Sequence, residues 1–505
     1  MYSYVNLPEK YLDEDKFKKV YMSYTNPVDL YQGKPKTKIV CTLGPSSDTE
    51  EVLIELIKTG MNVARLNMSH GEKSVHEIVF NRVRKVSEEL GVPVGIMVDV
   101  PGAKYRTGPT DPGALELQEG DKITLTSDDL IGDKNLVTVA PPGIHLDAGI
   151  GGTILVDDGN IEFIVDDISG ENVNCTVVRG GRLTERRGVV TPGRAPSQKF
   201  PDEKAIECLK FAAELGADFV ALSNVTRREE IWTARSILRE NGMKKPLIIS
   251  KVERAEAIDN LDEVVAASDA LMVARGDMGV EIPLYRVPVV QKELIRKSNS
   301  AGKPVITATQ MLESMVHSSS PTRAEVTDVA NAVFDGSDAI MLSGETSIGK
   351  FPIEAVKIMV NTSREAEAAL PYHKMMEERF LQLESKTDDV ISYAACQTSN
   401  LLGSKFIIAF TESGNSAGRV SRYRPESRIL ALTPWEEVCR VLTLRWGVYP
   451  IMVDTPTDVD EFFTVGEKEA RKFMAEGNKG TVVLVAGTPI GVPGSTNMLR
   501  VLQLS

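Results

Sequence analysis

The sequence lacks the features that assign a chain to a membrane, disulfide-rich or zinc-binding class. It has no run of about 18 apolar residues, which argues against a transmembrane helix. The five cysteines form no CxxC pair and are odd in number, so we expect free, mostly buried thiols, as in a reducing compartment. The five histidines show no HExxH or similar spacing, so we expect most of them to be surface or packing residues.

Positive charge is also scarce. The chain has 58 Lys and Arg residues against 71 Asp and Glu residues, a formal net charge of -13. This balance favours solubility and argues against binding to nucleic acid or to an anionic membrane. The first 36 residues have neither an apolar signal-peptide stretch nor the Arg-rich composition of a transit peptide. We therefore expect a cytoplasmic protein in which any anionic ligand meets a locally basic pocket.

Apolar side chains, by contrast, are plentiful. Hydrophobic residues make up 42% and charged residues 26% of the 505 residues, as in ordinary globular proteins. This composition excludes disorder along the whole chain. The length exceeds that of a typical single domain, so it predicts several domains or one large barrel with additions.

Short apolar, β-branched runs recur along the chain, with helical stretches between them. Consecutive runs start about 23 to 35 residues apart, the length of a strand-helix unit, except for one longer interval. The eight runs start at Lys38, Asn62, Val94, Phe219, Leu247, Ala270, Val305 and Ala339. Eight such strands, each followed by a helix, predict an α/β fold, the (β/α)8 TIM barrel.

The longer interval, between the third and fourth runs, predicts an inserted domain. Its short β-like pieces, separated by Gly, Asp and Pro turns, are typical of a small all-β, barrel-like module. After residue 370 a new alternation of strands and helices predicts a separate α/β open-sheet domain. We therefore predict an N-terminal arm at 1–36, the barrel at 37–107 and 197–370, the inserted domain at 108–196 and the C-terminal domain at 371–505.

Polar side chains follow most of the predicted barrel strands. In a TIM barrel, the residues at the carboxyl ends of the strands build the active site. Here they are Arg65, Asn67, Ser69, His70, Asp99, Lys104, Arg106, Ser223, Lys251, Glu253, Arg275, Asp277, Thr309, Ser343 and Glu345. We expect the function of the chain to reside among them.

Lys251 and Glu253 stand two apart on one predicted strand and therefore face the same side. One interpretation is a structural ion pair. The other pairs Glu253 with Asp277 as two oxygen ligands of a Mg²⁺ that keeps its other positions for substrate and water. Lys251 would then neutralise a phosphoryl group during its transfer.

Two further features near these residues suit an anion. Gly276, Asp277 and Gly279 open a short predicted helix whose free backbone N–H groups form a natural anion site, although a turn needed only for backbone geometry is the alternative. Arg65, two residues before Asn67, supplies a planar guanidinium group at the same end of the barrel, and such a group suits phosphate.

Long strings of the sequence resemble pyruvate kinase and occur in the order found in that family. The likeness extends more loosely over the inserted and C-terminal domains. The strings are TKIVCTLGPSS (37–47), MNVARLNMSHG (61–71), ISKVERAEAIDNLDEV (249–264), DALMVARGDMGVEIP (269–283), GKPVITATQMLESM (302–315) and PTRAEVTDVANAVFDGSDAIMLSGETSIGKFPIEAV (321–356).

The resemblance implies phosphoryl transfer from phosphoenolpyruvate to ADP, which gives pyruvate and ATP in glycolysis, with Mg²⁺ or Mn²⁺ as cofactor. It implies that Lys251 stabilises the phosphoryl group and that Glu253 and Asp277 bind the divalent metal. The backbone amides of Gly276 and Asp277, with Thr309 and the nearby Ser223, resemble the substrate-binding residues.

The remaining implied roles surround this centre. Arg65 resembles the phosphate-binding arginine, and four positions match residues near the nucleotide phosphates. These four are Asn67, His70, Arg106 and Arg187. Thr309, Ser343 and Glu345 are candidates for the water-linked path that protonates the enolate. Such catalysis works by positioning and charge neutralisation.

One departure from the family concerns potassium. The string D-T-K-G-P-E-I-R-T-G, usual after the third strand, is DVPGAKYRTG at 99–108 here. Val100 replaces the threonine, and Lys104 replaces the acidic residue associated with a monovalent-cation requirement. Our hypothesis is that the Lys104 ammonium takes the space and charge of K⁺ beside Asn67, Ser69 and Asp99, so that K⁺ is not required.

Two other departures lie near the pocket. SNVT at 223–226 stands where the family usually has Ser-Phe-Val-Arg, which removes an aromatic residue and an arginine. GVVTPG at 188–193 lies on the inserted domain, which closes as a lid in the family, and lacks a usual Asn and Leu. Both changes bear on substrate fit and turnover, while the lysine and the two carboxylates are kept.

The ends of the chain carry two more predictions. TESGNSA at 411–417 resembles the allosteric effector loop for a phosphorylated sugar, and a nucleotide effector or a plain helix cap is the alternative. The loop residues are Thr411, Ser413, Gly414, Asn415 and Ser416. The arm holds six of the twelve tyrosines, so we expect it to be ordered against a subunit of a homotetramer, the assembly that the resemblance implies.

Two other functions stay open. The first is a regulatory protein that keeps the fold and binds phosphoenolpyruvate but has lost turnover through the changes at 99–108 and 223–226. The second is a Mg²⁺-dependent barrel lyase or aldolase that acts on pyruvate-like enolates. The inserted domain and the basic residues on the nucleotide side speak against the second, and the fold alone does not decide between them.

Overall fold

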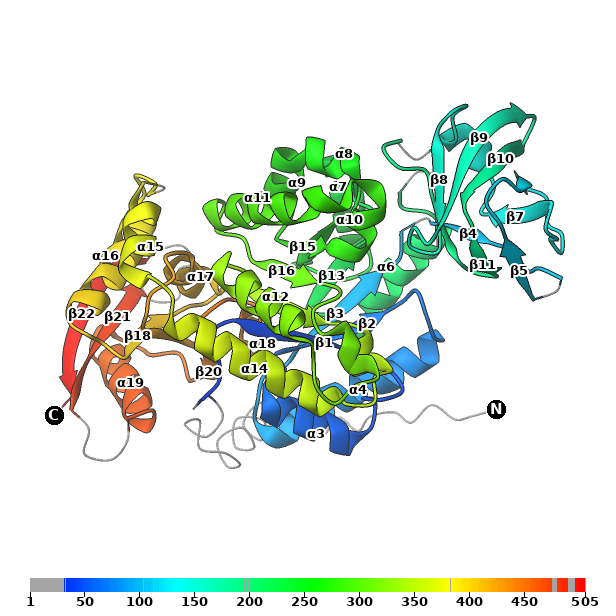
Figure 1. Ribbon diagram of the computed structural model, residues 1–505. Helices are drawn as coiled ribbons and strands as arrows, with labels where there is room; N and C mark the ends of the chain where they lie inside the picture. The colour runs from blue at the N-terminus through cyan, green and yellow to red at the C-terminus, as the bar shows by residue number, and fades with distance from the viewer. Residues whose placement is uncertain are drawn as a thin grey trace. The chain divides into compact units, whose positions relative to one another are not determined.

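A computed structural model gives the architecture of the chain. It describes residues 31–504, except for residues 32, 103, 112, 195–196, 198–199, 382, 475–478 and 489–495. The described residues form two compact units, one drawn from 1–66, 71–97 and 311–505 and the other from 67–70 and 98–310. Figure 1 shows the helices and strands of both units.

The predicted TIM barrel is confirmed as a closed barrel of eight strands in the order β1-β17-β16-β15-β14-β13-β3-β2. The strands are β1 (Lys38–Thr42), β2 (Val63–Asn67), β3 (Gly95–Val100), β13 (Phe219–Leu222), β14 (Ile248–Val252), β15 (Ala270–Ala274), β16 (Val305–Ala308) and β17 (Ala339–Leu342). Nearly every residue of these strands is buried, because a parallel sheet covered by helices has no solvent face. The continuous apolar runs in the sequence follow from this double burial.

Helices follow the barrel strands, and their ends agree with local sequence signals. They are α3 (Glu50–Thr59), α4 (Lys73–Leu90), α6 (Glu203–Leu215), α7 (Arg228–Glu240), α8 (Ala255–Asp259), α9 (Leu261–Ala267), α10 (Arg275–Glu281), η2 (Leu284–Arg286), α11 (Val287–Ser300), η3 (Glu313–Val316), α12 (Arg323–Phe334), α13 (Gly344–Ser347) and α14 (Pro352–Ala368). At the start of α12, Thr322 and Glu325 form a reciprocal capping box, as the pattern T-x-x-E predicts.

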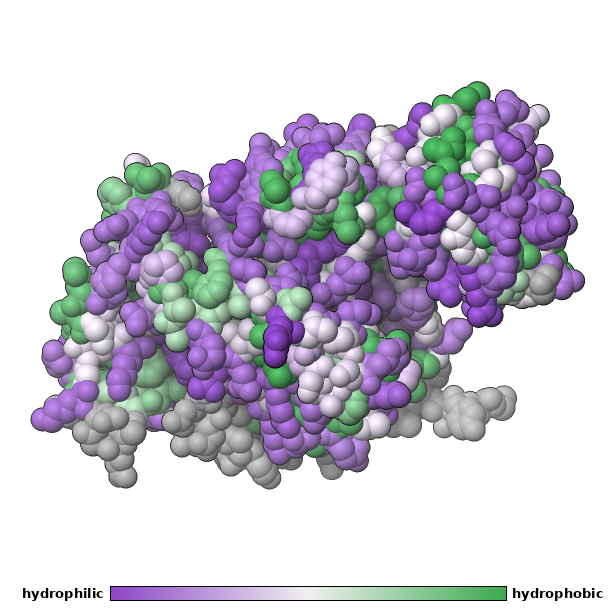
Figure 2. All heavy atoms as spheres, in the orientation of Figure 1, coloured by the Kyte–Doolittle hydropathy of each residue, from purple (hydrophilic) through white to green (hydrophobic). Residues whose placement is uncertain are grey.

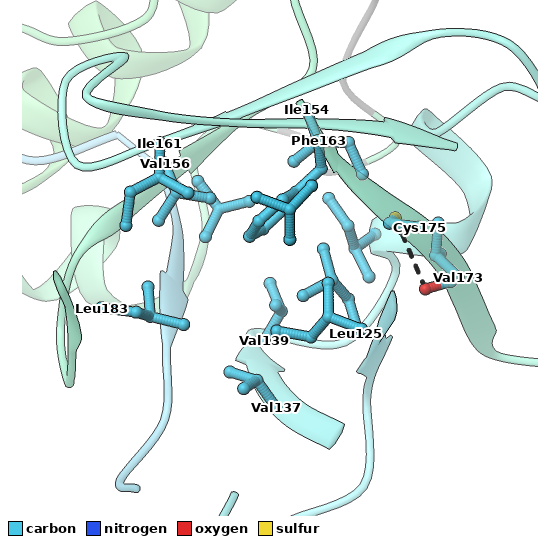
Figure 3. Close-up of a cluster of buried hydrophobic side chains, with 14 of the residues drawn as sticks. Leu125, Val137, Val139, Ile154, Val156, Ile161, Phe163, Val173, Cys175 and Leu183 are labelled. Atoms are coloured by element: carbon cyan, nitrogen blue, oxygen red, sulfur yellow. Dashed lines mark hydrogen bonds between the residues drawn. The ribbon is translucent and has the colours of Figure 1, made fainter. Parts of the chain in front are cut away.

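The inserted segment follows β3 and forms a closed seven-stranded barrel in the order β10-β6-β7-β4-β12-β8-β9. Its elements are β4 (Tyr105–Thr107), β5 (Ala114–Leu117), β6 (Lys122–Thr126), β7 (Leu136–Ala140), α5 (Ile144–Asp147), β8 (Thr153–Val156), β9 (Ile161–Ser169), β10 (Asn172–Arg179), β11 (Gly181–Thr184) and β12 (Gly188–Val190). Figure 3 shows Phe163 and Ile154 pointing toward Leu125 and Val139 across the interior. Buried and less buried residues alternate along the first half of β9, and its buried side chains, Ile161, Phe163 and Val165, help to fill the interior, as expected for a small barrel.

The C-terminal domain is a five-stranded sheet in the order β20-β19-β18-β21-β22, in which β22 alone is antiparallel to its neighbour. Its elements are α15 (Tyr372–Phe380), α16 (Thr387–Leu401), β18 (Phe406–Phe410), α17 (Asn415–Arg422), β19 (Arg428–Thr433), α18 (Glu436–Leu442), β20 (Val448–Met452), α19 (Val459–Lys472), β21 (Gly480–Gly487) and β22 (Thr496–Leu504). Ile407 packs toward α16 and α17, and Ile408 packs toward α19. Helices therefore cover both faces, as Figure 1 shows.

The structure also bears on the cysteines and on the surface of the molecule. All five cysteines are free and buried, as expected. Among the described residues, no helix combines the length and the apolar character needed to cross a bilayer. On the face drawn in Figure 2, hydrophilic residues predominate and hydrophobic ones form small separate groups.

The predicted domain boundaries stay predictions. Of the N-terminal arm, residues 1–30 and 32 lie outside the described part of the chain, and with them five of its six tyrosines. The sixth, Tyr31, packs edge-to-face on Tyr449, and its hydroxyl donates to the carbonyl of Pro450 at 2.8 Å.

A buried ion pair joins the C-terminal domain to the loop that precedes β17. The Arg424 guanidinium, 2% exposed, donates to Asp338 Oδ1 at 2.8 Å and to the carbonyl of Gly336 at 3.0 Å. It also lies over the ring of Trp446, with 5.0 Å between the guanidinium carbon and the ring centroid. Loss of the arginine would leave the Asp338 carboxylate buried without its countercharge.

We therefore expect Arg424→Met to lower the free energy of unfolding by about 3 to 5 kcal/mol, the cost of breaking a buried pair. The matched control is Arg471→Met, which removes an exposed pair with Glu467 on α19 and should cost less than about 0.5 kcal/mol. Urea unfolding of both variants checks the difference, and equal midpoints would contradict it.

Candidate active site

A cluster of buried charges lies at the carboxyl ends of β3 and β14 and at the start of α10. Lys251 is central to it: its Nζ lies 3.0 Å from Glu253 Oε1 and 3.3 Å from Asp99 Oδ1. The same nitrogen donates to Ser223 Oγ at 2.8 Å. Lys251, Glu253 and Asp99 are all less than 9% exposed, so water screens these charges little. The structure thus brings together the lysine and the first of the two carboxylates that the sequence singled out.

Lys104 and Asp277 complete the cluster. Their side chains form an ion pair between the Lys104 Nζ and the Asp277 Oδ1. Burial alone would raise the pKa of Asp277, but the ammonium groups of Lys104 and Lys251 outweigh it and hold this pKa at about 2. Burial would lower the pKa of Lys104, but Glu253 and Asp277 together raise it above its ordinary value. Both side chains are therefore charged at neutral pH.

Glu253 is the most constrained of the carboxylates. It is 0% exposed, and burial raises its pKa against the opposing effect of Lys251. Its Oε2 accepts the backbone N–H of Asn224 at 2.7 Å, while its buried Oε1 lies 3.0 Å from the Lys251 ammonium. Both oxygens are therefore engaged, and each keeps a second lone pair that a metal ion could use.

Three carboxylates and two ammonium groups make up the cluster, which leaves one negative charge in excess. Among the described residues, no group of three or more His, Cys, Asp or Glu side chains is arranged around a common metal position. Mg²⁺ needs no such cage, since it binds through one or two carboxylates and completes its shell with water and phosphate oxygens. Glu253 and Asp277 fit this requirement as two carboxylates that line the same cavity.

The predicted substrate cradle is present in part. The Gly276 backbone N–H donates to Thr309 Oγ1 at 2.8 Å, so this amide and this hydroxyl are already partners. Thr309 has a positive φ of 67°, and the Arg275 guanidinium donates to its carbonyl oxygen at 2.6 Å. A β-carbon at Gly276 would lie 3.5 Å from Thr309 Oγ1, an ordinary contact, so the backbone there comes close to the threonine.

The predicted nucleotide-side residues lie on the same unit as the charge cluster. A cavity of about 240 Å³ is lined by Lys104, Arg106, Arg187, Glu253 and Asp277, among others. The Arg187 Nη1 lies 3.0 Å from Asp157 Oδ1, and Arg106 donates to the carbonyl of Arg186 at 2.9 Å. A cavity lined by both arginines and carboxylates suits a polyphosphate bound to a divalent cation.

The residues of the predicted monovalent-cation region are tied together by short-range contacts. The Met68 backbone N–H donates to the carbonyl of Asp99 at 3.1 Å, and the Ser69 N–H donates to Asn67 Oδ1 at 3.2 Å. His70 belongs to the same turn, since its backbone N–H bonds the carbonyl of Asn67 at 3.3 Å. Val100, 0% exposed, ends β3 beside them.

Three predicted catalytic residues belong to the other unit: Arg65 lies in β2, and Ser343 and Glu345 follow β17. Arg65 donates to Thr42 Oγ1 at 2.8 Å and is 8% exposed. Glu345, 0% exposed, accepts the backbone N–H groups of Leu312 at 3.0 Å and Ser343 at 2.7 Å. The Ser343 hydroxyl is buried with no hydrogen-bond partner among the described residues.

The predicted effector loop follows β18 and opens α17, as the sequence indicates. Gly414 precedes the helix with a φ of 85°, a conformation that favours glycine. Ser416 Oγ lies 2.6 Å from Thr496 Oγ1, and the buried Thr411 hydroxyl has no partner within the described ranges. Asn415 is exposed and Ser413 is half-buried.

The structure also explains part of the SNVT departure and adds residues that sequence reasoning missed. Thr226 is buried, and its hydroxyl donates to the Glu230 carboxylate at 3.4 Å at the start of α7. Asp157, the partner of Arg187, was not singled out, although it lies in an Asp-Asp-Gly turn of the inserted domain. Arg254 was also missed: it pairs with Glu281 at 3.4 Å beside the cavity.

A phosphotransferase is the class of enzyme that this fold and site define. The barrel carries a buried lysine beside two carboxylates suited to Mg²⁺, and arginines line the same cavity. Family models described as "Pyruvate kinase, barrel domain" and "Pyruvate kinase, alpha/beta domain" match residues 34–356 and 389–502.

Similar proteins agree with these models. The chain is 42% identical over 467 residues to the pyruvate kinase of Clostridium acetobutylicum, which covers 92% of this chain and 99% of that protein. It is 43% identical over 467 residues to the pyruvate kinase of Staphylococcus saprophyticus, 92% of this chain and 80% of that protein. A crystal structure of a pyruvate kinase from Cryptosporidium parvum superposes with a TM-score of 0.87 at 34% identity, over 95% of this chain and 97% of that chain. The chain therefore belongs to the pyruvate kinase family.

The backbone at Asn224 generates a prediction about the cluster. Asn224 has a φ of 56°, a left-handed conformation that asparagine and glycine tolerate and β-branched residues do not. We expect Asn224→Val to cost about 1 to 2 kcal/mol of unfolding free energy, because it strains the residue whose N–H binds Glu253. Asn224→Gly keeps the conformation and should cost less. Urea unfolding compares the two, and equal stability would contradict this account.

Proposed function

We propose that the chain transfers the phosphoryl group of phosphoenolpyruvate to ADP, giving pyruvate and ATP. The observation that carries this proposal is the buried Lys251 ammonium, held by Glu253, Asp99 and Ser223 where a phosphoryl group can meet it. Phosphoryl transfer needs little covalent chemistry from the protein, so a fixed positive charge in a water-poor site is the main requirement.

Glu253 and Asp277 would hold the divalent cation, Mg²⁺ or Mn²⁺. When bound, this cation supplies Lewis-acid charge neutralisation for phosphate and carboxylate oxygens. The presence of Glu253 and Asp277 on the wall of one cavity supports the assignment. The charge balance supports it as well, because the cluster without a divalent cation carries one excess negative charge and would repel an anionic substrate.

The other side chains position the substrates. Ser223 accepts a hydrogen bond from Lys251 and orients its ammonium group, while Thr309 and the amides of Gly276 and Asp277 receive the substrate carboxylate. Arg106 and Arg187 bind the nucleotide phosphates. This assignment is supported by their position on the cavity wall.

For the remaining residues the support is the family likeness. Asn67 and His70 complete the nucleotide side, Arg65 binds phosphate, and Thr309, Ser343 and Glu345 carry the proton to the enolate.

Potassium independence is part of the proposal. Lys104 brings a permanent positive charge into the cluster through its ion pair with Asp277, and this supports the hypothesis that it replaces a monovalent cation. The hypothesis puts this ammonium beside Asn67, Ser69 and Asp99, whereas its ion pair in the structure is with Asp277. The charge argument is kept, because Asp277 and Asp99 belong to the same cluster.

Several features of the family complete the proposal: a homotetramer in the cytoplasm, and an effector with a phosphate group, from a sugar or a nucleotide, at residues 411–416. A regulatory protein without turnover stays the alternative. It would bind phosphoenolpyruvate saturably and form no ATP.

The role of Lys251 predicts the outcome of Lys251→Met. With Mg²⁺, phosphoenolpyruvate and ADP, we expect kcat to fall about 100- to 1,000-fold, as when a single electrostatic stabiliser is removed. Lys245→Met, at an exposed lysine before β14, is the matched control and should keep its rate. Thermal unfolding of both variants shows whether they fold. A folded Lys251→Met variant with full turnover would sink the proposal.

The role of Lys104 predicts the response to monovalent ions. Pyruvate formation should proceed at a similar rate in Na⁺ and in K⁺ buffers, because the charge that K⁺ supplies is already present. In Lys104→Glu we expect K⁺ to stimulate the rate about tenfold, which corresponds to about 1.4 kcal/mol of barrier. Strong dependence on K⁺ with Lys104 intact would contradict this prediction but would leave the kinase activity itself standing.

A further inference from the structure

A second basic cavity lies away from the residues assigned above. Its volume is about 590 Å³, within the range of small-molecule sites. Its walls come from the segment before β1, the end of α14, the start of α15 and the start of β19, all within one compact unit. Five cationic side chains line it: Lys34, Lys36, Arg364, Lys374 and Arg428.

The cations deepest in this cavity are hydrogen-bonded to neutral oxygens. Lys34 Nζ donates to the carbonyl of Ile57 at 3.1 Å, and Lys36 Nζ donates to the Tyr372 hydroxyl at 2.9 Å. Arg428 donates to the carbonyls of Tyr31 at 2.7 Å and Lys34 at 3.1 Å. These contacts satisfy the donors with neutral oxygens and not with carboxylates.

The two carboxylates on the cavity wall do not balance the five cations. Glu367 accepts the backbone N–H groups of Lys36 at 2.8 Å and Thr37 at 2.6 Å, so both of its oxygens are engaged by amides. Glu426 is exposed, and it therefore offsets buried charge only weakly. An excess of positive charge at this point is unexpected in a chain with a net charge of -13.

Burial shifts the pKa values of two of these lysines. Burial lowers the pKa of Lys34 to about 8. Burial also lowers the pKa of Lys36 to about 8, and the neighbouring Arg428 adds to the effect, although Glu367 and Glu426 oppose it. A bound anion would stabilise the charged form of both lysines.

We propose that this cavity binds a small phosphorylated metabolite, with its phosphate held by Lys36, Arg364 and Lys374. The class follows from the lining. A single inorganic ion would occupy a small part of 590 Å³, and the side chains of Leu370, Pro371 and Tyr372 give an organic group an apolar wall. The inference is independent of the catalytic roles proposed above, since the cavity shares no residue with them.

The test is the binding of phenyl phosphate, with inorganic phosphate and phenol as reference probes, to the full chain by isothermal titration calorimetry. Arg364 and Lys374 are exposed, so the double change to Gln should leave the fold intact. We expect this double variant to bind phenyl phosphate at least about tenfold more weakly, because two charge-assisted contacts are lost. Lys350→Gln with Lys357→Gln, two exposed lysines at the start of the same α14 region, is the matched control and should bind like the parent chain.

Two more variants separate this cavity from other phosphate sites. Ser413→Asp places a negative charge in the effector loop, and Lys251→Met removes the cation of the catalytic cluster. Binding at the proposed cavity should survive both changes. The proposal is overturned if phenyl phosphate does not bind, if its binding is lost in Ser413→Asp or Lys251→Met, or if the Arg364 and Lys374 double variant binds as the parent chain does. Equal affinity for inorganic phosphate and phenyl phosphate would overturn the assignment to an organic phosphate.

Discussion

The mutual neutralisation of the charges around Lys251 is the constraint on which the carboxyl end of the barrel depends. Isolated ions inside a protein carry a desolvation cost that only partners can offset, and Lys251 obtains such partners from three different segments of the chain. The turn at Ser223 and Asn224 serves the same purpose, since its hydroxyl contacts the lysine and its backbone N–H binds Glu253. Gly102 leaves room for this turn: a β-carbon there would lie 2.8 Å from Asn224 Nδ2.

The protein compensates its buried cations in different ways, with carboxylates at some sites and with neutral oxygens at others. In the charge cluster around Lys251, carboxylates face the ammonium groups. In the second cavity, carbonyl and phenol oxygens hold Lys34, Lys36 and Arg428, and their charge stays available. The buried pair of Arg424 and Asp338 is a third arrangement. One arginine faces one carboxylate, and the pair connects the C-terminal domain to the loop before β17.

The chain belongs to the pyruvate kinase family but departs from its usual strings at several positions. The departures do not affect the lysine and the two carboxylates on which the resemblance centres. Lys104 changes how the charge around them is supplied, through its pairing with Asp277. Thr226 has a structural use at the start of α7, because its buried hydroxyl donates to Glu230.

The sequence by itself determined the eight barrel strands, the inserted all-β domain and the candidate residues, because apolar periodicity and strand-end polarity are local properties of the chain. Tertiary structure decided what those properties leave open. Lys251 and Glu253 were predictable as neighbours on one strand, but the approach of Asp99, Ser223 and Lys104 required the barrel to close. The second cavity had no local signal at all, since Lys36, Arg364 and Arg428 are far apart in the chain and meet only through packing. Contacts between residues that are far apart in the sequence depend on how the chain packs, which no local sequence pattern encodes.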